Sequence, residues 1–345
     1  MKETVLTIGM PAGSLADPNR GGNLISLLER SGYKTSGYEK GGPSKFSNTN
    51  FLYGWDGRPQ EFSSQLGVNE IDIAIAGDDW IKERVLELEL EYDTNIKLEK
   101  VLSLNRGNVR IVGIIDECYP QNNAEDFIKD VLSKKDIIVV VSEMPYLALD
   151  WINSKLKNLN LYDNYKDFSV QKYKTPSKIK KGILIYETWG KTEAKIKNGG
   201  ADIGLEITQT GSALKNYKLK IIDEVMQSET GIWINPIIKQ DFDKKELLDM
   251  FLLNLYGAIS AESKVLIAFN VPNIDSQEIE KYMSENNLYA DEPTVSVGKN
   301  FTVYNIQVDT SNKELPIARV RYELAKRNAK NINTIPLTSS IHGLL

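Results

Sequence analysis

Short apolar runs alternate with amphipathic stretches through the first two thirds of the chain. The apolar runs predict strands, and stretches with apolar residues three or four positions apart predict helices. The expected strands span residues 5–8, 71–76, 109–115, 137–141, 182–186 and 201–207, and the expected helices span 24–30, 80–88, 146–156 and 192–197. Strands that alternate with helices are typical of an α/β fold with parallel sheets that are covered on both faces.

The pattern changes after about residue 236. Leucines, a phenylalanine and an isoleucine three or four positions apart predict a long helix over 244–260. A strand, a helix, two strands, a helix and a strand then follow at 265–269, 276–285, 294–297, 301–308, 316–327 and 333–335. This is the order of a ferredoxin-like module. Two polar stretches, 36–50 and 158–180, are expected to be exposed loops.

Composition narrows the class of protein. The 345 residues carry a formal net charge of −5, which argues against a dedicated nucleic-acid binder. No apolar run is long enough for a transmembrane helix, and the charged N-terminus does not resemble a secretory signal. We therefore expect a soluble cytoplasmic protein that binds neither nucleic acid nor a membrane.

Two residue types occur once each and exclude several mechanisms. Cys118 alone cannot form an internal disulfide or a cysteine-rich zinc site. His342 lies three residues from the C-terminus, which makes a Ser-His-Asp triad very improbable. Chemistry in this chain is therefore expected to use carboxylates, lysines, hydroxyls, backbone N–H groups and bound cofactors.

The clearest candidate site follows the strand expected at 201–207. The next seven residues are rich in hydroxyls, and a helix can begin near Ala213; they are Thr208, Gln209, Thr210, Gly211, Ser212, Ala213 and Leu214. Backbone N–H groups, hydroxyls and a helix start suit a phosphate, and Glu206 before them could bind ribose hydroxyls or Mg²⁺. An ordinary helix start, at which Thr210 or Ser212 bonds its own backbone, is an equally open interpretation.

Two further strand ends carry candidate residues, and α/β proteins bind ligands where such ends meet. The first strand runs into a turn with Gly13 and Ser14, and the strand at 71–76 runs into Gly77, Asp78 and Asp79. One of these two aspartates is expected to cap the following helix, while the other could face a cleft.

Cations and acids near these turns add three more candidates. Arg20 and Arg58 lie in glycine-rich loops, where a guanidinium can clamp a phosphate. Glu193 follows a strand and either serves a site or caps the next helix.

At these residues the sequence resembles ATP phosphoribosyltransferase, the first enzyme of histidine biosynthesis, in its long form with a regulatory C-terminal domain. The segments that carry the resemblance are 72–80, 189–193, 200–214, 244–264 and the tail through 335–337. The 200–214 segment is similar to the loop with which the family holds the phosphate of phosphoribosyl pyrophosphate (PRPP). Trp189-Gly190 stands where the family has Asn-Gly.

The resemblance implies a two-lobed body like a periplasmic binding protein, followed by a ferredoxin-like (ACT/PII-like) α+β domain. Lobe I is expected at 1–108 with 229–260, lobe II with the phosphate loop at 109–228, and a regulatory and oligomerisation domain at 261–345. The implied reaction joins C1 of the ribose of PRPP to N1 of ATP and releases pyrophosphate. Glu193 and Glu206 are implied as catalytic residues, 208–214 as the PRPP loop, and Mg²⁺ as the cofactor, with Glu206 as its candidate ligand. The family also implies a cytoplasmic dimer or hexamer that histidine inhibits allosterically.

Three positions depart from the family pattern. A lysine and an arginine of the first turn are replaced by Ala12 and Ser14, and a threonine of the phosphate loop is replaced by Ala213. We expect Arg20, from an insertion near 18–22, to replace part of the lost charge together with Arg58. A paralogue with a changed acceptor, or a non-catalytic ligand-binding or regulatory protein with the same cleft, is the alternative that these departures leave open.

Overall fold

The computed structural model describes residues 4–12, 22–40, 44–288 and 294–344. The chain divides into two compact units. Unit 1 comprises residues 1–25 and 35–245, and unit 2 comprises residues 26–34 and 246–345. Each unit is described by itself.

Unit 1 is built on a mixed sheet with the strand order β4-β1-β5-β11-β6-β10-β7-β9-β8. These strands are β1 (Leu6–Pro11), β4 (Leu52–Gly57), β5 (Ile73–Gly77), β6 (Glu99–Asp116), β7 (Ile137–Ser142), β8 (Phe168–Lys172), β9 (Gly182–Glu187), β10 (Ile203–Thr208) and β11 (Leu219–Ile234). Strand β1 is parallel to β4 and β5, and β7 is parallel to β9 and β10. Strand β11 is antiparallel to both β5 and β6.

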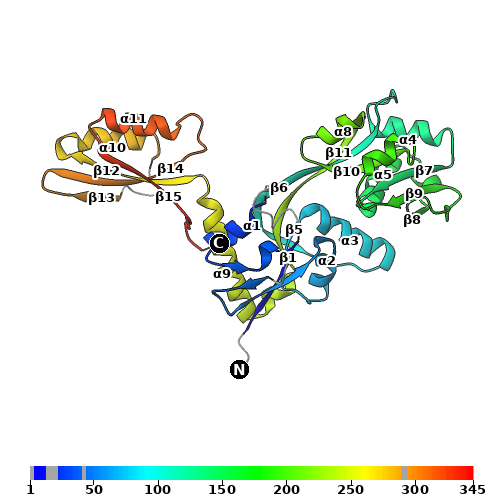
Figure 1. Ribbon diagram of the computed structural model, residues 1–345, viewed down its shortest axis with the longest axis horizontal. Helices are drawn as coiled ribbons and strands as arrows, with labels where there is room; N and C mark the ends of the chain where they lie inside the picture. Colours follow the sequence, from blue (N-terminus) through cyan, green and yellow to red (C-terminus); the bar gives the residue numbers. More distant parts are fainter. Residues whose placement is uncertain (1–3, 13–21, 41–43, 289–293, 345) are drawn as a thin grey trace. The chain divides into compact units, whose positions relative to one another are not determined.

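Helices cover this sheet at both ends (Figure 1). They are α2 (Pro59–Gly67), α3 (Asp78–Tyr92), α4 (Ala124–Leu132), α5 (Pro145–Asn158), α6 (Tyr162–Tyr165), α7 (Thr192–Lys197) and α8 (Ser212–Asn216). Helix α1 (Leu24–Arg30) begins at the end of a unit 1 segment and belongs mostly to unit 2. Short elements complete the unit: β2 (Thr35–Ser36), β3 (Lys45–Phe46), and the 3₁₀ turns η1 (Tyr38–Lys40) and η2 (Pro236–Gln240).

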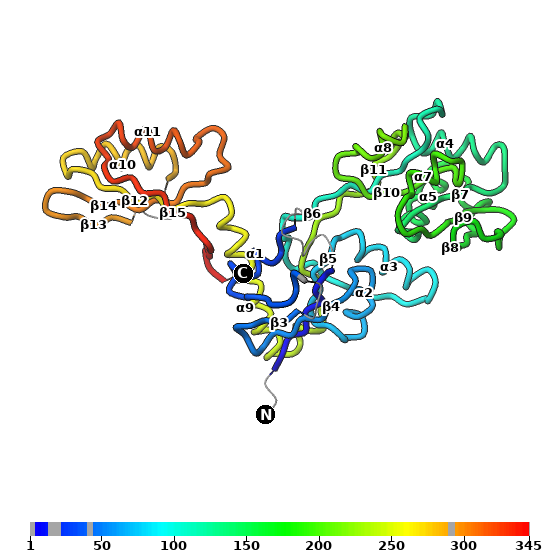
Figure 2. Tube along the Cα trace, viewed as in Figure 1, coloured from blue at the N-terminus to red at the C-terminus, as the bar shows by residue number. Residues whose placement is uncertain are grey.

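Two long strands join the two ends of unit 1. Figure 2 shows β6 and β11 running side by side from one end to the other, and their register extends from Leu219 opposite Asp116 to Ile234 opposite Glu99. Strands β1, β4 and β5 with α2 and α3 form the first lobe, while β7 to β10 with α4, α5 and α7 form the second. The expected lobe boundaries at 108/109 and 228/229 fall within these two strands and stay a prediction.

Each lobe has its own core. Phe62, Leu66 and Ile71 belong to the buried cluster of the first lobe. The larger cluster of the second lobe includes Phe127 and Trp151, and Trp80 of α3 packs against it. The two lobes therefore make apolar contact through α3.

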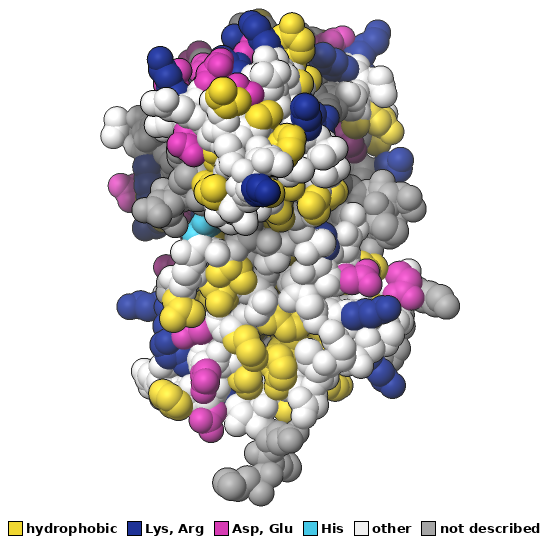
Figure 3. All heavy atoms as spheres, turned by 90° about the vertical axis from the view of Figure 1, so that its left-hand side faces the viewer, with side chains coloured by type: hydrophobic (Ala, Val, Ile, Leu, Met, Phe, Trp, Pro, Cys, Tyr) yellow, Lys and Arg dark blue, Asp and Glu magenta, His cyan; other side chains and the backbone are white. Residues whose placement is uncertain are grey.

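Unit 2 carries an antiparallel sheet in the order β13-β14-β12-β15. After α9 (Phe242–Ser260), which begins in unit 1, the chain forms β12 (Lys264–Pro272), η3 (Asn273–Asp275), α10 (Ser276–Glu285), β13 (Thr294–Val297), β14 (Phe301–Asp309), α11 (Ile317–Lys326) and β15 (Lys330–Pro336). Phe269 stacks on Tyr304 in its core, with ring centroids 5.5 Å apart. His342, the one cyan side chain in Figure 3, is exposed and lies 2.7 Å from Lys264 Nζ.

The structure confirms the α/β body and the C-terminal α+β module, and corrects three expectations. The sheet is mixed rather than parallel, since β11 is antiparallel to β5 and β6. The sequence did not predict β11, because acidic residues such as Asp223, Glu224 and Glu229 interrupt its apolar pattern. The stretch 36–50 is not simply an exposed loop, since Tyr38 and Ser44 are buried. The stretch 158–180 contains α6 and the edge strand β8, whose half-buried residues form no apolar run. No helix among the described residues is long and apolar enough to span a bilayer.

Candidate active site

A pocket of about 480 Å³ lies where several chain segments of unit 1 converge. Gly77 is the last residue of β5, Asp79 lies in the first turn of α3, Arg58 directly precedes α2, and Gln209 lies in the loop after β10. These four were all candidates from the sequence. Ala12, which replaces a family lysine, lines the same pocket and contributes no charge.

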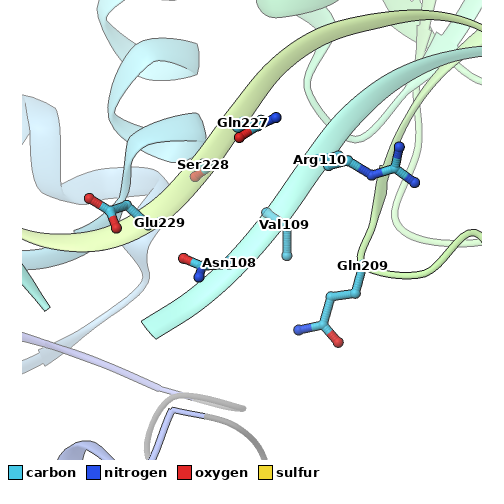
Figure 4. Close-up of a pocket in the computed structure, with 7 residues that line it drawn as sticks. All are labelled: Asn108, Val109, Arg110, Gln209, Gln227, Ser228 and Glu229. Atoms are coloured by element: carbon cyan, nitrogen blue, oxygen red, sulfur yellow. The ribbon is translucent and has the colours of Figure 1, made fainter. Parts of the chain in front are cut away.

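A second pocket of about 460 Å³ shares Val109 and Gln209 with the first. Its other lining residues are Asn108 and Arg110 of β6 and Gln227, Ser228 and Glu229 of β11 (Figure 4). The two long strands that join the lobes therefore line it. Arg110 is ion-paired with Glu224 at 3.0 Å and is not a free cation.

Asp79 is the buried acid of the first pocket, with only 4% of its surface exposed. Ser228 Oγ donates a hydrogen bond of 2.9 Å to its carboxylate and accepts one of 3.1 Å from its backbone N–H. Burial raises the pKa of Asp79, and the hydrogen bond from Ser228 opposes that shift. The carboxylate is thus held in place by a strand far away in sequence.

Asp78, the neighbouring acid, does not line the first pocket. Lys100 Nζ is 2.9 Å from its carboxylate and also bonds Glu229 at 2.7 Å. The expectation that one of the two aspartates caps the helix is wrong: the N-cap is Gly77, in an extended conformation with no side-chain cap, and α3 begins at Asp78 itself. Both acids still lie in the first turn, where the helix dipole favours negative charge.

Glu206, near the end of β10, lies in a group of carboxylates. Burial, together with the nearby charges of Glu193 and Glu143, raises the pKa of Glu206 to about 7, although hydrogen bonds from Thr192 and from the Ile207 N–H at 3.0 Å act in the opposite direction. The two carboxylates implied as catalytic are thus electrostatically coupled. Carboxylates with shifted pKa values are common at functional sites.

The loop after β10 makes local hydrogen bonds and still exposes polar groups. Thr208 Oγ1 accepts from the Gly211 N–H at 2.9 Å, and Thr210 Oγ1 accepts from the Ser212 N–H at 3.3 Å. Gly211 has a φ of 74°, which favours glycine, and is the N-cap of α8. Gln209, Thr210, Ser212 and Ala213 are exposed, whereas Gly211 and Leu214 are buried. The local bonds of the helix-start interpretation are present, and the exposed hydroxyls stay available to a ligand.

Not every candidate can be placed, and some lining residues were not anticipated. Gly13, Ser14 and Arg20 lie outside the described residues. Sequence reasoning missed Ser228 and Asn108, which lie within β11 and β6. Neither residue carries a clear local signal, because polar residues surround both of them in the sequence. Among the described residues, no cluster of three or more His, Cys, Asp or Glu side chains is placed to hold a metal ion.

Comparison with known proteins identifies relatives. Residues 58–257 match the family model of ATP phosphoribosyltransferase. The ATP phosphoribosyltransferase of Desulfosudis oleivorans is 28% identical over 276 residues, covering 78% of each chain. That of Geotalea daltonii is 25% identical over 342 residues, covering 98% of this chain and 99% of the relative. The fold is similar to the ATP phosphoribosyl transferase (HisG:HisZ) complex from Thermotoga maritima, with a TM-score of 0.50, 16% identity and coverage of 73% of this chain and 98% of that one.

Proposed function

Because this chain belongs to the ATP phosphoribosyltransferase family, we propose that it transfers the phosphoribosyl group of PRPP to N1 of ATP. The new bond joins N1 to C1 of the ribose. The bond from C1 to pyrophosphate breaks, and pyrophosphate leaves with the electron pair. Such a reaction needs no nucleophile from the protein, in keeping with the exposed Cys118 and the exposed His342. The protein contributes positioning and charge stabilisation.

The convergence of Arg58, Asp79 and Gln209 on one pocket is the observation that carries this proposal. Arg58 has no ion-pair partner among the described residues, so its guanidinium is available to the pyrophosphate of PRPP. The exposed hydroxyls of Thr210 and Ser212 are suited to the 5′-phosphate. The ribose would then span the distance between the loop and Arg58.

Glu206 and Glu193 are the carboxylates that would bind a magnesium ion in this proposal. Burial and the charge of Glu193 raise the pKa of Glu206, so a bound cation would favour its ionised form, and carboxylate oxygens are the ligands that Mg²⁺ prefers. Mg²⁺ needs only one or two protein carboxylates when substrate phosphates complete its shell. The bound ion would neutralise the pyrophosphate as it leaves. The two carboxylates would orient the ribose through its hydroxyls.

The test is incubation of the full chain with Mg²⁺, PRPP and ATP, with release of pyrophosphate and formation of the adduct as readouts. We expect both in wild type and a loss of at least about a hundredfold in kcat for Glu206→Gln, the size of effect seen when one group that stabilises charge in a transition state is removed. The same assay tests one alternative, a paralogue with another acceptor, to which the uncharged Ala12 in the pocket is relevant. Pyrophosphate release with a different nucleobase compound, and none with ATP, would establish that alternative. Binding of neither substrate would favour a non-catalytic protein.

We further propose that residues 261–345 regulate and assemble the protein, which would act in the cytoplasm as a dimer or hexamer under inhibition by histidine. The separate core of this segment supports a distinct role. Sedimentation of the full chain with and without histidine tests the proposal. A monomer whose activity ignores histidine would contradict it.

A further inference from the structure

A pocket of about 560 Å³ in unit 1 is separate from the candidate active site. Helix α3, the segment before β6 and strand β11 line it. None of its described lining residues also lines one of the two pockets of the candidate active site. This α3–β11 pocket has a volume typical of sites for small molecules.

Helix α3 contributes different faces to the two sites. Asp78, Ile81, Lys82 and Val85 lie on one face of the helix, because they follow each other at helical spacing, and they line the α3–β11 pocket. Asp79 lines the first pocket of the candidate active site from another face. The α3–β11 pocket therefore lies outside the reaction site, and the proposed function makes no use of it.

The wall of the α3–β11 pocket is apolar and reaches the cores of both lobes. Ile81 belongs to the buried cluster of the first lobe, and Leu98 and Trp233 pack against that cluster. Met226 packs against the cluster of the second lobe. Leu98, Trp233 and Met226 are only half-buried, so apolar surface beside both cores is open to solvent. An apolar molecule that covers this surface is stabilised by the hydrophobic effect.

The charged residues of the lining leave one cation without a partner. Asp78 is 2.9 Å from Lys100 Nζ, so its negative charge is compensated. Lys82 is 3.3 Å from Asp150 of α5. Lys97 is exposed and has no ion pair or hydrogen bond among the described residues. An apolar wall beside a free ammonium group complements an apolar molecule with one negative charge.

We propose that the α3–β11 pocket binds a small apolar carboxylic acid, with its hydrocarbon part against Ile81, Val85 and Met226 and its carboxylate paired with Lys97. The apolar part supplies most of the binding free energy. The exposed ion pair with Lys97 contributes less and determines which of several apolar molecules is preferred. The proposal does not depend on the proposed function, because none of these residues lines the pockets of the candidate active site.

The chemical class of the ligand is tested by calorimetric titration of the full chain with octanoate, octanol and octylamine, which share one hydrocarbon chain. We expect octanoate to bind with a dissociation constant of about 1 mM or below. Octanol is expected to bind roughly threefold more weakly, the effect of one exposed ion pair, and octylamine more weakly still. Equal binding of octanoate and octanol by wild type would overturn the proposal.

The role of Lys97 is tested by the same titrations with Lys97→Gln. This variant is expected to bind octanoate and octanol equally, because the ammonium group is lost. Lys129→Gln is the matched control, since Lys129 is exposed in unit 1 and does not line the pocket. A preference for octanoate that survives in Lys97→Gln would contradict the assignment.

The location of the site is tested with Val85→Trp, which fills the α3–β11 pocket with a larger side chain. We expect octanoate binding to be lost, while the melting temperature without ligand changes by less than about 2 °C, because the new ring occupies open space. Leu90→Trp places the same side chain on an exposed position of α3 outside the pocket and is expected to bind octanoate as wild type does. Octanoate binding by Val85→Trp that equals wild type would overturn the location.

Thermal unfolding gives a second measurement of the same binding. Octanoate at about ten times its dissociation constant is expected to raise the melting temperature of unit 1 by about 3 °C in wild type and to leave that of Val85→Trp unchanged. An equal rise in both proteins would show that octanoate binds elsewhere.

A second copy of the chain is the other occupant that an apolar wall suggests, and sedimentation separates the two cases. We expect Val85→Trp to sediment as wild type does. Dissociation of an oligomer by Val85→Trp, together with no binding of octanoate to wild type, would assign the wall to a subunit interface and overturn the proposal.

Discussion

Gly113 and Trp151 illustrate how closely single residues fit in the second lobe. Gly113 lies in β6, and a Cβ at this position would overlap the indole ring of Trp151 from α5. The indole is buried and donates a hydrogen bond of 2.8 Å to Asp223 of β11. The ring therefore has little room to move, and helix α5 packs directly on the backbone of β6.

Gly113→Ala is expected to lower the free energy of unfolding by about 2 kcal/mol, because the added methyl group must displace a well-packed ring. Denaturant titration measures the change. Trp151→Phe removes the overlapping part of the ring, so the double variant should lose less stability than the two single changes summed. Additive losses would show that the clash is relieved in some other way.

Arg58→Ala is expected to raise the KM for PRPP by at least about tenfold, because a charge-assisted hydrogen bond to a phosphate is lost. The melting temperature should change little, since this side chain has no ion pair to lose among the described residues. Arg319→Ala, an exposed arginine of unit 2, is the matched control. Steady-state kinetics with varied PRPP measures the effect, and an unchanged KM would remove Arg58 from the site.

At the scale of elements, α3 holds α5 through a buried acid. Glu83 of α3 accepts N–H hydrogen bonds of 3.0 and 2.7 Å from Tyr146 and Leu147 in the first turn of α5. Burial raises the pKa of Glu83 to about 8 against the effect of these bonds. The carboxyl is therefore mostly protonated in the folded protein at neutral pH.

This pKa predicts that stability falls as pH rises. Between pH 4.5, the ordinary value for the unfolded chain, and about 8, the folded protein binds a proton that the unfolded chain has lost. The stabilisation is thus lost progressively across that window. Glu83→Gln cannot bind this proton, so its stability does not depend on pH in this way. The difference in melting temperature between the variant and wild type should therefore shift by about 5 °C in favour of the variant from pH 5 to pH 9. Glu89→Gln, exposed on the same helix, should show no such trend.

The elements that could be predicted from sequence are those with a clear local signal. Helices 24–30, 192–197 and 276–285 have the predicted bounds, because apolar spacing and a following glycine or asparagine mark them. Strand β11 was missed and β6 was predicted only over 109–115, because polar residues interrupt the apolar pattern of both strands. Pairing with strands distant in sequence stabilises them in spite of these residues, and a local pattern does not reveal such pairing. The candidate site divides in the same way. Strand-end residues such as Asp79 and Gln209 carry a local signal, whereas Ser228 and Trp80 enter through tertiary packing.

At the scale of the whole molecule, the two units have separate hydrophobic cores. Phe269 is almost fully buried in the core of unit 2, in a cluster whose residues all lie in β12 or later elements. Units with separate cores commonly unfold as separate cooperative transitions.

Phe269→Ala is expected to remove about 3 kcal/mol or more from unit 2, because a large buried ring leaves a cavity. Scanning calorimetry should show one transition shifted to lower temperature and the other unchanged. A single transition that shifts as a whole would show instead that the units unfold cooperatively.

The pairing of β5 with β11 also determines when the sheet of the first lobe can be completed during translation. Strand β5 is complete at residue 77, yet its antiparallel neighbour ends at residue 234. During translation, the first lobe therefore has an open strand edge until more than 150 further residues have left the ribosome. Closing so long a loop is slow, and an open edge is prone to pair with other chains. Ribosome-bound chains stopped before residue 219 should accordingly depend on chaperones, while chains extended past α9 should not.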